Sequence, residues 1–184
     1  MAIHAASEGN SLERYIGEVR SIWGNGKDSQ LPFKVKSLME KLLASTSPDD
    51  PWMAQRIREA RPSRKLYRDP EYGFIQMGHV HQKGHGNSPH DHGPCWVVYG
   101  AYSGLTEITL YRRTDDGKEP GKAILEKKEL HHLSPGVVYP YLPGDIHSIN
   151  AVEGPAVVFR FLSTHLEKVE RYRYNLEKRT VVRV

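Results

Sequence analysis

The sequence predicts a mainly β protein with a helical segment at its N-terminal end. The spacing of apolar residues changes near residue 62. Before this point they recur at helical spacing, and after it they lie in short runs typical of β-strands. Gly or Pro separates many of these runs, and no helix-length pattern lies between them. Parallel strands need such helical crossovers. The remaining candidates are therefore an antiparallel sandwich, barrel or jelly roll.

The chain is expected to divide into two parts. Residues 1–62 should form helices packed beside the β fold, and residues 63–184 the β fold itself with further strands near the C-terminal end. The strands expected in the second part are Arg64–Arg68, Gly73–Gln82, Trp96–Tyr102, Glu107–Arg113, Ala123–His132, Val137–Leu142, His147–Ala151 and Ala156–Ser163.

Three helices are expected before residue 62. Apolar side chains recur at the spacing of one helical stripe within Leu12–Ile22, and Ser11 is a candidate N-cap. A second helix is expected over Pro32–Thr46. A third begins at Pro51, where a missing N–H is harmless, and ends at Pro62.

The composition predicts a globular protein and argues against several classes. The 184 residues carry an evenly spread formal charge of +4, which does not indicate a nucleic-acid-binding protein. No apolar run approaches the ~20 residues of a membrane span. The N-terminus lacks the basic and apolar regions of a secretory signal, and the one cysteine, Cys95, permits no internal disulfide. A cytoplasmic location is therefore expected.

Two short segments carry histidines at positions suited to metal binding. His90 and His92 lie two residues apart, so in a strand both imidazoles point to the same face. His147 follows a Pro143–Gly144 turn, where a new strand should begin. From the opposite side of a barrel it could complete the ligand set. Exposed polar positions are the alternative for all three histidines.

Together the two segments resemble the motifs of the cupin superfamily. Gly84–Gly104 has a glycine, five residues, the His-x-His pair and a later glycine, and Gly144–His147 matches the Gly-x-x-His of the second motif. Pro143 and Asn150 are each displaced by one position from the cupin pattern. The resemblance implies a double-stranded β-helix, the cupin or jelly-roll barrel.

One departure from the cupin pattern affects the implied metal shell. The usual fourth ligand is a glutamate, and its position here is Val97, which cannot bind a metal. The resemblance therefore implies a shell of three neutral imidazoles, from His90, His92 and His147. Imidazole donors suit Fe, Zn, Cu and Ni. Without a carboxylate ligand the ion keeps its full charge, which favours an anionic substrate.

A closer resemblance is to the cysteine dioxygenases. Gly84–His92 reads Gly-His-Gly-x-Ser-x-His-Asp-His, as in that family, and the plan of a helical part followed by one barrel is also similar. The resemblance implies non-haem Fe(II) that binds a small thiol and O₂ and yields a sulfinate. The partners expected are thus a small thiol carboxylate and O₂, with no nucleic acid or membrane. The oligomeric state is left open.

Two arginines are candidates for binding the substrate carboxylate. Arg68, on an early strand, is the best match by position to the carboxylate-binding arginine of the family. Arg160 occupies the middle of three late-strand positions where family members commonly have Ser, His and Tyr, flanked here by Val158 and Leu162. The sequence does not decide between the two arginines, and either could instead be exposed.

Several alternatives remain open. His79 and His81 form a second His-x-His pair but lack the motif spacing, which favours a structural role. Cys95 is expected to be a small buried residue, with a cross-link to Tyr99, Tyr139 or Tyr141 as the alternative.

Because a fold does not fix a function, two rival functions remain. One is a metal-dependent isomerase, hydrolase or lyase, with Zn or Ni, and the other is a non-catalytic metal or ligand module.

Overall fold

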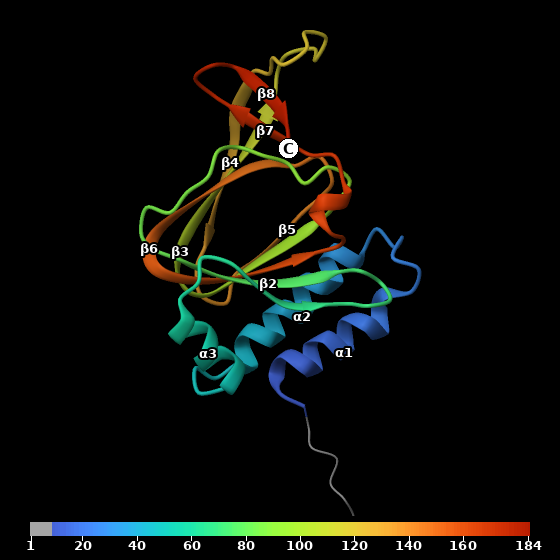
Figure 1. Cartoon of the computed structure of the whole chain (residues 1–184), viewed down its shortest axis with the longest axis vertical. Helices are drawn as coiled ribbons and strands as arrows, with labels where there is room; N and C mark the ends of the chain where they lie inside the picture. The colour runs from blue at the N-terminus through green and yellow to red at the C-terminus, as the bar shows by residue number, and fades with distance from the viewer. Residues whose placement is uncertain (1–8) are drawn as a thin grey trace, which may run out of the picture.

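The computed structural model describes residues 9–184, which form three helices followed by an antiparallel β fold (Figure 1). The mainly β prediction with a helical N-terminal segment is confirmed. The elements are α1 (Ser11–Trp23), α2 (Leu31–Ser45), α3 (Pro51–Glu59), β1 (Arg64–Arg68), β2 (Ile75–His81), β3 (Val97–Arg113), β4 (Leu125–Leu133), β5 (Val138–Tyr141), β6 (Ile146–Leu162), a 3-10 turn η1 (Leu166–Lys168), β7 (Tyr172–Asn175) and β8 (Thr180–Arg183). No helix in this range has the length and apolar character needed to cross a membrane.

Helix α1 begins with a reciprocal capping box, one residue before the expected cap. The Asn10 side chain accepts a hydrogen bond from the Glu13 N–H at 3.0 Å, and the Glu13 carboxylate accepts one from the Asn10 N–H at 3.0 Å. This pairing satisfies two backbone donors that the helix itself leaves free. Ser11 is buried instead, and its hydroxyl donates to Asp50 at 3.0 Å, which joins α1 to the start of α3.

The two long strands β3 and β6 form the centre of the sheet, whose order is β1-β2-β6-β3-β4. The sequence predicts two separate strands within each of them, and the structure differs here. One half of β3 pairs with β5 and the end of β6, and the other half pairs with β4 and the start of β6. Register shifts between Ala101 and Thr106 bend β3, and Gly104 within the bend has a φ of 74°. Where the sequence predicts a break between two strands, β3 and β6 continue as single strands and stay paired with each other.

Side chains alternate along β6 between two hydrophobic clusters. Phe159 and Phe161 point to the outer face, where they pack with side chains of all three helices. Val158 and Leu162 belong to a second cluster on the inner face. Because successive residues of a strand point to opposite faces, Arg160 shares the inner face with Val158 and Leu162. Figure 1 shows the helices together on one side of the β fold.

Phe161→Ala is expected to destabilise the fold by about 3–5 kcal/mol, the usual cost of deleting a buried phenylalanine ring. Phe161 is fully buried, and its ring centroid lies 5.2 Å from that of Phe74 and 5.3 Å from that of Trp96. Denaturant-induced unfolding measures the loss. The matched control is Phe33→Ala on α2, where the side chain is 44% exposed and the loss should stay below about 1 kcal/mol. Equal losses in the two variants would contradict this account of the core.

Candidate metal centre

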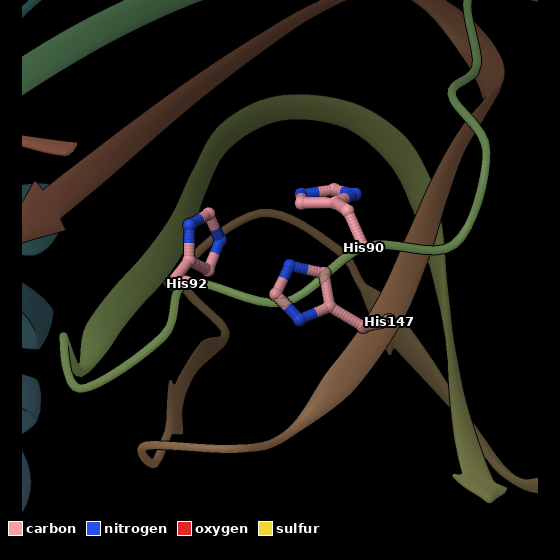
Figure 2. Close-up of side chains that lie close together, drawn as sticks. All are labelled: His90, His92 and His147. Atoms are coloured by element: carbon pink, nitrogen blue, oxygen red, sulfur yellow. The ribbon is translucent and has the colours of Figure 1, made fainter. Parts of the chain in front are cut away.

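The structure brings His90, His92 and His147 together on the inner side of the β fold (Figure 2). Each offers one ring nitrogen, and these three atoms lie within 4.8 Å of one another. The ring centroid of His147 is 4.8 Å from that of His90 and 5.1 Å from that of His92. Figure 2 shows the imidazoles facing a common space, with His147 projecting from β6 and the other two from the segment before β3.

Backbone pairing places His90 opposite His147. The His90 N–H donates to the His147 C=O at 2.9 Å, and the His147 N–H donates to the His90 C=O at 2.9 Å. Gly86 extends this contact, since a Cβ there would lie 3.1 Å from the carbonyl oxygen of Ile149. Gly144, with a φ of 86°, forms the turn that leads into β6. The glycines of both motifs therefore serve the backbone geometry that carries the histidines.

The three imidazoles are neutral and have free nitrogen lone pairs. Burial lowers the pKa of each of them, and the nearby charge of Arg160 lowers each pKa further. His92 and His147 are buried, and none of their ring nitrogens has a hydrogen-bond partner among the described residues. In His90, Nδ1 lies 3.0 Å from the carbonyl oxygen of Ser88 and must donate to it, which leaves Nε2 free.

This donor set fits a divalent metal ion. Buried nitrogens without partners are costly, and a shared ion would satisfy all three imidazoles at once. No carboxylate belongs to the group within residues 9–184. Val97 is fully buried on the inner face, and Asp91 bonds to Gly93 and Tyr174 instead. The buried His₃ group agrees with the shell expected from the sequence, and its chemistry does not select one metal.

A cavity of about 490 Å³ opens beside His90 and His92, and Arg160 forms part of its wall. The Arg160 Nη1 atom donates to the Tyr99 hydroxyl at 3.5 Å, and the guanidinium carbon lies 5.9 Å from the centre of the Tyr99 ring. An arginine in this position can hold a carboxylate through two hydrogen bonds while the acid is next to the histidines. Of the two candidate arginines, Arg160 is the one at the cavity.

Arg68 lies elsewhere, and its expected role at the site is not supported. Its side chain is exposed at the end of β1, and it does not line the cavity. The reason is topological, because β1 is the edge strand and β2 separates it from β6. The sequence correctly placed Arg68 on an early strand, ahead of the first histidine motif. It could not show where that strand lies in the lateral order of the sheet.

Three further residues of the site were not assigned to it from the sequence, which named Tyr141 only as a possible cross-link partner of Cys95. Arg171 and Arg173 line the same cavity and come from the C-terminal segment around β7. Tyr141 is buried with its ring centroid 4.9 Å from that of His147, and its hydroxyl lies 3.1 Å from Nδ1 of His131. Only the alternation of tyrosine and arginine over 171–174 could have indicated that one side of this segment carries cations.

The second histidine pair and the cysteine lie outside the group of three histidines. His79 is buried with Nδ1 3.1 Å from the carbonyl oxygen of Pro62. His81 is also buried, and its ring stacks on that of His85 with the centroids 4.3 Å apart. Cys95 is a buried free thiol whose sulfur lies 3.2 Å from the Ser163 hydroxyl.

Parts of the chain are similar to several solved structures, although no protein-family model and no curated protein matches its sequence. It is 18% identical to KdgF from Halomonas sp., over 58% of this chain and 83% of that one, with a TM-score of 0.42. A cupin superfamily protein from Desulfitobacterium hafniense is 16% identical, with coverages of 56% and 76% and a TM-score of 0.41. Peruvianin-I from Thevetia peruviana latex is 19% identical over 50% of this chain, with a TM-score of 0.39. The chain spans only about half of Peruvianin-I, 51%.

Single replacement of His90, His92 or His147 by Ala is expected to lower metal affinity by roughly two orders of magnitude or more, because one of three donors is lost. Metal content after equilibration with Fe(II), Zn(II) or Ni(II), measured by elemental analysis, tests this. The control is His132→Ala, where the side chain is 60% exposed and metal content should not change. A full equivalent of tightly bound metal in the variants lacking His92 and His147 would contradict a shared site.

Proposed function

We propose that this chain is a metal-dependent enzyme of the cupin superfamily that oxidises a small thiol carboxylate to its sulfinate. The observation that carries the proposal is the group of three buried, neutral histidines without a carboxylate, beside a cavity that contains Arg160. A bound Fe(II) would supply the thiolate and oxygen chemistry at this position. The overall reaction, RSH + O₂ → RSO₂H, needs no other oxidant or reductant.

The residues of the chain would bind and orient the substrate. Arg160 offers the planar guanidinium that grips a carboxylate with two hydrogen bonds, and Tyr99 restrains it from one side. Positioning the thiol at the histidines lowers the barrier by fixing the reacting groups in place. The neutral imidazoles leave the positive charge of the metal undiminished for an anionic sulfur.

A second candidate is a metal-dependent hydrolase, isomerase or lyase of the same superfamily. Three imidazoles suit zinc or nickel as well as iron, and this property of the donor set favours the alternative as much as the dioxygenase. A non-catalytic metal or ligand module is the third possibility.

The decisive experiment is anaerobic loading with Fe(II), followed by measurement of O₂ uptake and sulfinate formation across a panel of small thiols. The zinc-loaded protein is the matched control and should consume no O₂. No uptake with any thiol would reject the dioxygenase.

Arg160→Lys is expected to raise KM for thiol carboxylates by about 10-fold or more while changing KM for neutral thiols little. The charge is kept but the two-bond grip on the carboxylate is lost. Steady-state O₂ uptake with 3-mercaptopropionate and 2-mercaptoethanol measures both values. The matched control is Arg68→Lys, since Arg68 is exposed away from the cavity. An unchanged preference between the two thiols in the Arg160→Lys variant would remove Arg160 from carboxylate binding.

A further inference from the structure

The wall of the metal cavity carries three cationic side chains and no acidic one. Arg160 comes from β6, Arg171 precedes β7, and Arg173 lies on β7. None of the three forms an ion pair within residues 9–184, whereas Arg20, Arg113 and other arginines bind carboxylates. These three guanidinium groups, none of which is paired with a carboxylate in that range, thus line a cavity that also touches His90 and His92.

Two of these guanidinium groups have donors that are buried and unused. The Nε–H groups of Arg160 and Arg171 are inaccessible to solvent and have no acceptor among the described residues. A buried donor without a partner is costly, and the cost is larger when the group is charged. Both arginines also line the cavity, where a bound anion would bring acceptors to their guanidinium groups.

The segment that bears Arg171 and Arg173 is held firmly against the histidines. The Tyr172 N–H donates to the Asp91 carboxylate at 3.1 Å, and the Tyr174 hydroxyl donates to the same carboxylate at 2.9 Å. These two contacts hold the segment against Asp91. Successive residues of a strand point to opposite faces, so Arg173 points away from the face that carries the Tyr174 side chain. Arg171, just before the strand, lines the same cavity as Arg173. Arg173 also lies directly opposite His90 in the backbone pairing.

The arginines reach the histidines from different parts of the chain. Arg173 lies opposite His90 in the backbone pairing, and Arg160 and Arg171 line the same cavity as His90 and His92. A volume of about 490 Å³ is within the range of small-molecule pockets and leaves space for a ligand that reaches more than one arginine.

From this arrangement we propose that the cavity binds a small molecule with at least two anionic groups. One group would be held by Arg160 beside the histidines, and the other by Arg171 and Arg173. The inference rests on the proposed function in that it concerns the same cavity, and it narrows the substrate class from a thiol monocarboxylate to a thiol dicarboxylate or another thiol dianion.

Binding of matched probes tests the proposal without relying on turnover. Calorimetric titration of the metal-loaded protein compares mercaptosuccinate with 3-mercaptopropionate, which lacks the second carboxylate. Succinate and butyrate form the same comparison without a thiol. Each dianion should bind at least 10-fold more tightly than its monoanion, and the difference should shrink as salt is raised. Equal affinities within both pairs would overturn the proposal.

Variants assign the preference to particular side chains. Arg171→Gln and Arg173→Gln should each reduce the preference for the dianion several-fold with little effect on the monoanion, and Arg171→Lys should retain part of it. The matched control is Arg112→Gln, on a side chain that is 70% exposed and pairs with Glu126 on the surface. If the glutamine variants fold, as judged by circular dichroism, and keep the full preference, the assignment is wrong. If they do not fold, the wild-type comparison alone decides.

The outcomes separate this inference from the proposed function. A preference for succinate over butyrate without O₂ uptake on any thiol would support the dianion site and reject the dioxygenase. O₂ uptake with equal affinity for monoanions and dianions would support the dioxygenase and overturn the dianion site.

Discussion

The pair of backbone hydrogen bonds between His90 and His147 is the contact on which the candidate site depends. Each residue donates to the other at 2.9 Å, as in the closely spaced pairs of an antiparallel ladder. Residues directly opposite each other in such a ladder point to the same face. The contact therefore joins the irregular segment before β3 to β6 and, in the same step, directs both imidazoles to the inner side. His92 lies two residues further along this segment, and its ring centroid is 5.1 Å from that of His147.

The alternation of β6 links this site to the hydrophobic core. Its outer side chains, among them Phe159 and Phe161, bury the helices, while its inner side chains face the cavity. A shift of one residue in register would exchange the two sets and place Arg160 in the aromatic cluster under α1. Burial of the phenylalanines thus fixes the register that presents Arg160 to the cavity. The helices therefore affect the site through this packing, and none of their side chains lines the cavity.

The inner side of the β fold buries polar and charged groups that lack, among the described residues, the partners such groups usually have. It contains imidazoles without hydrogen-bond partners and guanidinium groups without carboxylates. Such groups reduce stability unless a ligand completes them, and they are typical of sites that bind charged partners. Asp91, the carboxylate nearest in sequence to the histidines, is used to anchor Tyr172 and Tyr174. The cavity consequently keeps its positive charge, and the C-terminal segment remains attached to it.

The sequence by itself determined the element types and the three histidines. The period of apolar residues, the His-x-His spacing and the Pro-Gly turn are local features, which depend on a few neighbouring residues. The sequence did not determine that Arg68 lies at an exposed edge, nor that Tyr141, Arg171 and Arg173 reach the site. Those positions follow from strand order and from hydrogen bonds between distant segments. The tertiary structure decided them because the lateral order of strands, unlike their alternation, depends on pairing partners far away in the chain.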